Sequence, residues 1–224
     1  MKKNDQRIKY DIEAAIEWDA AIVDDYIGIE VINGWVRLYG TVPTYRSKLA
    51  AEDNAWATRG VKGIDNEISV KYLLTASEDE DLQLKQRIEA VLKWNTDLST
   101  ESVSIEVNQG QVTLKGFVPQ YWQKLRIADL ISGLENVQEI SNGILIVLAQ
   151  KNNDIKIAQA INSALLRSDL LPQEKFSITV RNGVVTLNGE IPTTFAKWRI
   201  KNIANNTNGV IDVLDQAEIA YEMI

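Results

Sequence analysis

The chain has 224 residues, of which 45% are hydrophobic and 25% are charged, and its formal net charge is −7. This composition is typical of a soluble globular protein and is too acidic to favour nucleic acid, whose phosphates are bound by clustered Lys and Arg. The absence of Cys and His excludes disulfides, thiolate nucleophiles, Cys- or His-based metal sites and the usual general base of catalysis near neutral pH.

The first predicted element is an amphipathic helix, because Ile8, Ile12 and Ile16 are spaced by four and form one apolar face. The same spacing returns twice, at Leu84, Ile88 and Leu92 and at Ile157, Ile161 and Leu165. The candidate N-cap residues of the three helices are Asn4, Ser77 in a capping box, and Asn153.

A β-hairpin is predicted after each of these helices. Apolar and polar residues alternate on both sides of Asn33-Gly34, a dipeptide that favours a type I′ turn with positive φ at both residues. Gly40 marks a bulge or a close backbone approach at the strand end, and Pro43 ends the strand because it has no N–H to donate. The pattern returns at 105–119 and 178–192, with the turn and strand-end residues Gln109, Gly110, Gly116, Asn182, Gly183 and Gly189.

A second helix is predicted after each proline, and a last strand closes each unit. Equivalent apolar positions of the helix are Leu49, Leu125 and Trp198, and the last strands begin near Val61, Val137 and Val210. The hairpin is antiparallel, whereas the strand-helix-strand crossover makes the last strand parallel to a hairpin strand.

These elements define three tandem αββαβ modules, which we place at 1–75, 76–150 and 151–224. The linkers between them are short, at about 74–79 and 149–154. Each module is predicted to be a small three-stranded mixed sheet covered on one face by two helices, which places the chain in the α+β class.

The amphipathic helix, the Ile-x-Val-x-x-Gly-x-Val-x-Leu-x-Gly-x-Val-Pro hairpin and the Val-x-x-[Ile/Val]-x-Asn strand resemble the BON domain, the module named for bacterial osmotically inducible and nodulation proteins. The resemblance covers nearly the whole chain, three times over. It implies an αββαβ fold, a non-catalytic role and attachment to phospholipid membranes, in proteins that are often periplasmic and induced by stress. No signal peptide is evident, because Asn4-Asp5-Gln6-Arg7 stands where an apolar segment is needed. We therefore expect a cytoplasmic protein as written, or a periplasmic one if a signal has been removed.

Catalysis finds little support in the sequence. Ser-His-Asp and Cys-His arrangements cannot be built, no Ser-x-x-Lys occurs, and the glycine spacing does not fit a phosphate loop. The acidic run at 78–81 lacks the alternating pattern of a calcium loop. We assign the carboxylates to solvated helix surfaces and linkers and expect none to share one position in all three modules. No enzyme activity, cofactor or metal is therefore expected.

Aromatic and basic side chains gather where each second helix begins, a combination suited to an interfacial membrane contact. The same residues could instead pack the helix against its own sheet, with lysine stems covering apolar area. The candidate surface-binding residues are Tyr45, Lys48, Tyr121, Trp122, Lys124, Phe195, Lys197, Arg199 and, beside the hairpin turn, Trp35. The modules carry net charges of −2, −5 and 0, so the third is best suited to an anionic surface.

Trp18 and Trp94, at equivalent places after the first helix, are assigned to local packing, whereas Trp56 and Trp198 are assigned to the core. Trp35 is either a contact residue or part of an interface between modules.

Two functions follow from these observations. The favoured one is a non-enzymatic protein of an envelope or osmotic stress response that binds phospholipid surfaces through one module. The alternative is a protein–protein scaffold, in which modules pair through sheet edges or helix faces. Nucleic acid and small-molecule substrates are not expected partners.

Overall fold

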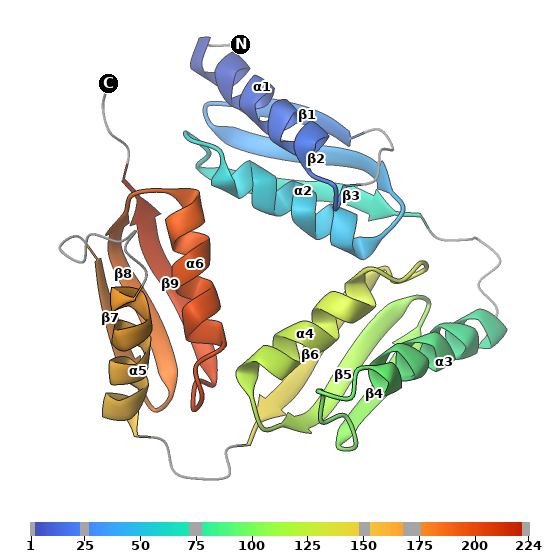
Figure 1. Cartoon of the computed structure of the whole chain (residues 1–224). Helices are drawn as coiled ribbons and strands as arrows, with labels where there is room; N and C mark the ends of the chain where they lie inside the picture. The colour runs from blue at the N-terminus through green and yellow to red at the C-terminus, as the bar shows by residue number, and fades with distance from the viewer. Residues whose placement is uncertain (1–2, 23–26, 72–77, 148–152, 168–175, 221–224) are drawn as a thin grey trace. The chain divides into compact units, whose positions relative to one another are not determined.

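The computed structural model describes residues 3–22, 27–71, 78–147, 153–167 and 176–220, and the same order of elements occurs in them three times (Figure 1). The first module consists of α1 (Lys3–Trp18), β1 (Ile27–Ile32), β2 (Trp35–Val42), α2 (Tyr45–Ala57) and β3 (Gly63–Val70). The second consists of α3 (Glu78–Trp94), β4 (Val103–Asn108), β5 (Gln111–Val118), α4 (Tyr121–Ser132) and β6 (Glu139–Ile146). The third consists of α5 (Asp154–Leu166), β7 (Phe176–Arg181), β8 (Val184–Ile191), α6 (Thr194–Asn205) and β9 (Asp212–Ile219). The predicted αββαβ order is confirmed.

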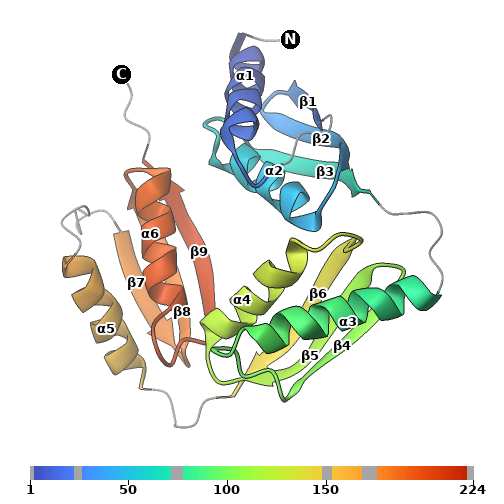
Figure 2. The ribbon, with the colours of Figure 1, turned by 45° about the vertical axis from the view of Figure 1, so that its right-hand side comes forward.

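Each module contains one three-stranded sheet in which the second hairpin strand is central. In the first module β2 pairs antiparallel with β1 and parallel with β3, and β8 pairs in the same two ways with β7 and β9. Two helices lie on one face of each sheet, as Figures 1 and 2 show. The predicted α+β class with mixed sheets is therefore correct. Contacts divide the chain into two compact units, which are Met1–Lys115 with Ile127–Gly143 and Gly116–Arg126 with Ile144–Ile224.

The apolar residues that the sequence spaces by four form the helical side of the cores. Ile8 and Ile12 of α1 are buried against the inner face of the first sheet, where Leu38 is completely buried. The third module repeats this packing, with Ile161 of α5 against Leu187 of β8. On α2 the core positions are alanines, Ala51 and Ala55, and larger side chains lie elsewhere on that helix.

The hairpin turns have the predicted backbone. Residues of the three turns all have positive φ: 54° and 85° at Asn33 and Gly34, 49° and 73° at Gln109 and Gly110, and 50° and 79° at Asn182 and Gly183. Both central residues of a type I′ turn need such angles, and Asn and Gly tolerate them best. The strand-end glycines Gly40, Gly116 and Gly189 also have positive φ, of 126°, 118° and 99°. Gly40 stays paired with both neighbouring strands, so it meets a backbone requirement without a bulge.

The helix starts are partly as predicted. Asn153 caps α5, because its side chain accepts a hydrogen bond of 3.2 Å from the Lys156 N–H. The prediction for Asn4 is wrong, since α1 begins at Lys3 and Asn4 lies inside the helix. Ser77 and most of the two linkers lie outside the described residues. Thr44 and Thr193, which the sequence analysis did not single out, cap α2 and α6.

Candidate surface-binding site

An exposed aromatic pair lies on α6 of the third module. The rings of Phe195 and Trp198 are stacked, with centroids 6.0 Å apart and planes inclined by 26°. The two residues are 60% and 57% exposed. They are three positions apart and therefore share one helix face, while Ala196 and Ile200 are buried against the sheet. The prediction that Trp198 belongs to the core is wrong, because the smaller neighbours fill the space against the sheet.

The two basic candidates on α6 have different surroundings. The Lys197 ammonium lies 3.1 Å from the Asp215 carboxylate and donates a hydrogen bond of 2.5 Å to the Ala217 carbonyl. Lys201 also pairs with Asp215, at 3.5 Å. The Lys197 ammonium is therefore engaged by β9 of its own sheet. Arg199 is exposed beside the aromatic pair and is the basic candidate best placed to meet an external anion.

The helix starts of the first two modules are less open. Tyr45, Lys48, Tyr121, Trp122 and Lys124 are all half-buried. Burial, and next the charge of Glu139, raise the pKa of Tyr45. The pKa of Tyr121 is raised to about 12, mainly by burial. The second cause is a hydrogen bond of 2.9 Å that the Tyr121 hydroxyl donates to Asp212, which belongs to the same compact unit. The aromatic residues at these helix starts are thus half-buried in two modules and exposed in the third.

We expect the Tyr121 environment to make stability depend on alkaline pH. A phenol whose pKa is raised by folding holds its proton longer in the folded state, so stability is retained below about pH 10 and falls as the pH rises towards about 12. Urea unfolding of Tyr121→Phe should lack this part of the decline, since phenylalanine does not ionise. Near-ultraviolet titration should show one fewer late-ionising tyrosine in that variant, and an unchanged titration curve would contradict the assignment.

Three other tryptophans are more exposed than predicted, and Trp35 is exposed as well. Trp18 and Trp94 end α1 and α3 and are 87% and 86% exposed, so local packing is the wrong assignment for both. Trp56 is 51% exposed because α2 turns its alanines towards the core. Trp35, the first residue of β2, lies on the sheet face opposite the helices and is 61% exposed.

One recurring carboxylate position was missed by the sequence analysis, which expected none. Asp5, Asp81 and Asp154 lie near the starts of α1, α3 and α5, each three residues before the first buried apolar residue of its helix. Each side chain accepts hydrogen bonds from both backbone N–H groups of its hairpin turn. The distances are 3.1 and 3.1 Å for Asp5, 2.6 and 3.0 Å for Asp81, and 2.8 and 2.9 Å for Asp154.

The opposite side of each turn is held by the residue that directly precedes the last strand. The turn glycine carbonyls of Gly34, Gly110 and Gly183 accept from the N–H groups of Lys62, Gln138 and Ile211, at 2.8, 2.9 and 3.0 Å. We refer to the aspartate and these carbonyl contacts together as the turn clamp. The clamp joins the first helix, the hairpin and the last strand, and it gives the recurring carboxylates a structural role.

The described part of the chain offers little for other chemistry. It contains no group of three or more Asp or Glu side chains that could hold a metal ion. A shallow pocket of about 600 Å³ lies beside α3 and β4, lined by both charged and apolar residues such as Lys85, Glu89 and Leu98, and none of the candidate residues lines it. Among the helices that the structure describes, none is long and apolar enough to cross a membrane.

Comparison with known proteins gives matches along the whole repeat. A family model described as "BON domain" matches residues 4–72, 80–147 and 153–221. Osmotically-inducible protein Y of Escherichia coli (strain K12) is 25% identical over 169 residues, which cover 73% of this chain and 83% of that protein. The C-terminal domain of CdsD, a structural protein of the type III secretion system of Chlamydia trachomatis, is 17% identical over 95% of this chain and 96% of its own, with a TM-score of 0.26. A second CdsD structure has the same identity and TM-score over 94% and 91%.

Proposed function

The chain belongs to the BON domain family, and on that premise we propose that it is a non-enzymatic protein of an osmotic or envelope stress response that attaches to phospholipid surfaces. The stress assignment is supported by the similarity to osmotically-inducible protein Y. The attachment is supported by the exposed Phe195–Trp198 pair of α6, which is the observation that carries the proposal.

The aromatic pair suits the border between headgroups and acyl chains. Tryptophan is enriched at membrane–water interfaces because its ring is apolar and its indole N–H is polar. Two stacked rings on one helix face enter such an interface together, and the helix can lie along the surface while the core residues stay behind it. Arg199 on the same helix can pair with lipid phosphates, for which the planar guanidinium is well shaped.

The charge distribution supports the third module as the attaching one. Its sequence has a net charge of 0, compared with −5 for the second module. An anionic leaflet attracts basic side chains by about 1 kcal/mol each and repels acidic ones. Attachment through α6 therefore brings the least repelled module to the lipid.

We expect the double variant Phe195→Ala/Trp198→Ala to bind vesicles at least about tenfold more weakly, because two exposed rings that bury apolar area in lipid are lost. The measurement is co-sedimentation of the full chain with phosphatidylglycerol vesicles. Trp94→Ala is the matched control, since Trp94 is an exposed tryptophan on α3. Equal binding by the double variant and the control would contradict attachment through α6 while leaving attachment elsewhere open.

We expect Arg199→Gln to weaken binding to the same vesicles about fivefold, the loss of about 1 kcal/mol of attraction. Arg181→Gln is the control for net charge, because Arg181 is an exposed arginine of the same module at the end of β7. The proposal predicts that the control binds as the unmodified protein does. A similar loss in both variants would show that overall charge, and not the α6 surface, governs binding.

A second candidate function, a protein–protein scaffold, is favoured by a feature of the second module. Phe117 and Leu145 are 49% and 67% exposed and occupy the repeat positions of Thr41 and Ser69, whose hydroxyls are hydrogen-bonded at 3.2 Å in the first module. An exposed apolar pair in place of a polar one is typical of a protein contact. Affinity capture with the unmodified chain and with Phe117→Ser/Leu145→Ser tests this function, which predicts partners that only the unmodified chain retains.

A further inference from the structure

The first sheet has an open face, which is the face opposite its two helices. The central strand β2 places two aromatic side chains and an arginine on this face. Along β2, Trp35, Arg37 and Tyr39 alternate with the buried Val36 and Leu38, so all three lie on the face opposite the helices. Trp35 and Tyr39 are four residues apart, which places their Cα atoms about 13 Å from each other. We refer to Trp35, Arg37 and Tyr39 as the open-face row.

Both aromatic rings of the row lie over glycines of the neighbouring strands. Trp35 is paired with Gly63 of β3, and Tyr39 with Gly28 of β1. A Cβ atom added to Gly63 would come within 2.3 Å of the Trp35 ring, and one added to Gly28 within 2.3 Å of the Tyr39 ring. The glycines are buried although they lie on the open face. Each ring therefore lies across the glycine of the neighbouring strand, and the Trp35 side chain stays 61% exposed while it does so.

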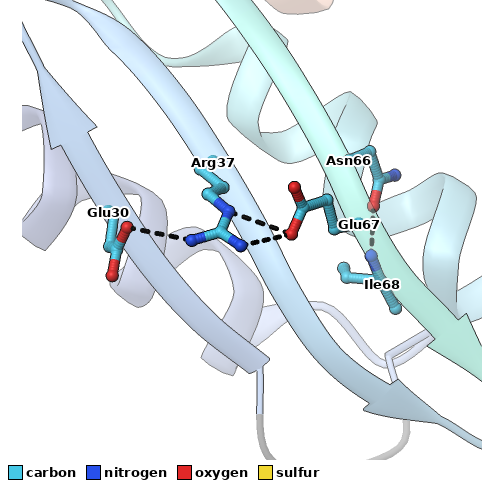
Figure 3. Close-up of polar contacts among 5 residues, drawn as sticks. All are labelled: Glu30, Arg37, Asn66, Glu67 and Ile68. Carbon is cyan, nitrogen blue, oxygen red and sulfur yellow. Dashed lines mark hydrogen bonds and ion pairs between the residues drawn. The ribbon is translucent and has the colours of Figure 1, made fainter.

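Arg37 is held by carboxylates on both sides, as Figure 3 shows, and along β2 it lies between Trp35 and Tyr39. Its guanidinium is 3.5 Å from Glu30 of β1 and donates hydrogen bonds of 2.9 and 2.5 Å to Glu67 of β3. It also lies 5.5 Å from the centre of the Tyr39 ring. With the exposed Asp65 beside it, this face has three carboxylates and one guanidinium, so it repels an anion.

The second and third modules have no aromatic residue and no arginine at the three positions that correspond to the open-face row. The row positions are Gln111, Thr113 and Lys115 in the second module and Val184, Thr186 and Asn188 in the third. Where the first module has glycines under the rings, the third has Ser177 and Asp212 paired with Asn188 and Val184. The rings and the glycines beneath them therefore occur together, in the first module alone.

We propose that the open-face row binds an uncharged oligosaccharide. The C–H faces of sugar rings pack against flat aromatic rings by dispersion and by removal of apolar area from water. Polar groups lie between the two rings. The carboxylate oxygens of Glu30 and Glu67 accept hydrogen bonds from sugar hydroxyls, and the Arg37 guanidinium donates to sugar oxygens. The span of the row requires several linked sugars. The negative charge of the face disfavours phospholipid headgroups and single-stranded nucleic acid, which would otherwise suit exposed rings.

Covering the glycines also stabilises the sheet, since aromatic side chains compensate for glycine in strands. That role needs only the sheet-facing side of each ring. Trp35 nevertheless remains 61% exposed, and the outward side of the ring is the part that the proposal assigns to the sugar. The two roles separate in an experiment that measures binding and stability together.

The test is calorimetric titration of the full chain with two probes, the linear β-1,4-linked hexamers of glucose and of N-acetylglucosamine. We expect at least one to bind, and Trp35→Ala to weaken that binding about tenfold, as the loss of one stacked ring should. Trp18→Ala, which removes a more exposed tryptophan of the same module, should bind as the unmodified protein does. Gly63→Ala should also weaken binding, because the added methyl group displaces the Trp35 ring without removing it.

Three results would overturn the proposal. The first is no heat of binding with either hexamer. The second is equal binding of a hexamer by Trp35→Ala and by the unmodified protein. The third is tighter binding of an anionic probe, such as a single-stranded oligonucleotide, together with loss of that binding in Trp35→Ala. Thermal unfolding of each variant accompanies the titration. Vesicle binding should be unchanged in Trp35→Ala, so the sugar site and the α6 surface succeed or fail separately.

Discussion

Replacement of Asp5 by alanine is expected to lower the free energy of unfolding of the first module by about 3–6 kcal/mol. The substitution leaves the N–H groups of Asn33 and Gly34 without their acceptor, and each hydrogen bond to a charged group contributes about 1.5–3 kcal/mol. It also removes a negative charge from the positive end of the α1 dipole. The measurement is urea unfolding of the full chain, with hydrogen exchange assigning the loss to the first module.

The matched control for this variant is Asp11→Ala on the same helix. Asp11 lies 3.8 Å from Arg7 in an exposed i,i+4 pair, which is worth about 0.3–0.5 kcal/mol. The structure predicts faster exchange of the turn amides in Asp5→Ala and unchanged exchange in Asp11→Ala. Similar stability losses in both variants would show that Asp5 acts only as a surface charge and that the turn clamp is not needed.

Replacement of Leu38 by alanine should cost about 2–5 kcal/mol, the range found when a buried leucine leaves a cavity. Leu38 is completely buried in the middle of β2. It belongs to the core cluster to which α1 and α2 both contribute side chains. Its loss affects the central strand, on which both ladders of the sheet depend. Chemical denaturation of the full chain measures the change.

Ile32→Ala is the control in the same sheet, because Ile32 ends β1 and is 67% exposed. Truncation of this side chain should change stability by less than about 0.5 kcal/mol, as is usual for surface positions. A loss at Ile32 as large as the loss at Leu38 would contradict the assignment of the inner and outer faces of the first sheet.

The repeat made most of the fold predictable. Alternation around Asn33-Gly34 and the spacing of Ile8 and Ile12 are local patterns with one physical solution each, a type I′ hairpin and an amphipathic helix. The structure confirms both, in the first module and in its two repeats. The parallel direction of the last strand followed from the strand-helix-strand crossover, whereas the structure showed that the hairpin strand it joins is β2.

The tryptophans were not predictable in the same way. Trp56 and Trp198 lie on helices whose apolar periodicity contains more residues than the small sheet can cover, and Ala51, Ala55 and Ala196 take the inward positions. A small residue on the inner face lets the helix approach the sheet, and a large one then lies outside. Sequence periodicity alone does not show which of two neighbouring apolar residues is turned inward.

The turn clamp and the open-face row depend on contacts between distant residues. Asp154 is 28 and 29 positions from the two amides that it binds, so its role is invisible in local patterns. The available signal was its spacing of three residues from the first of the apolar residues spaced by four, Ile8, Leu84 and Ile157, which is equal in every module. For Trp35 and Tyr39 the signal was the presence of Gly63 and Gly28 on the neighbouring strands, which becomes informative only when the register is known.

Co-sedimentation of the unmodified full chain with anionic and with neutral phospholipid vesicles tests the proposed function most directly. It is carried out at low salt and at about 0.5 M salt, where charge attraction is screened to within a few ångströms. The proposal predicts binding to anionic vesicles at low salt that weakens as salt is added, with a residual part contributed by Phe195 and Trp198. Absence of binding to either kind of vesicle at both salt concentrations would contradict it, and the scaffold function would then be the one to pursue.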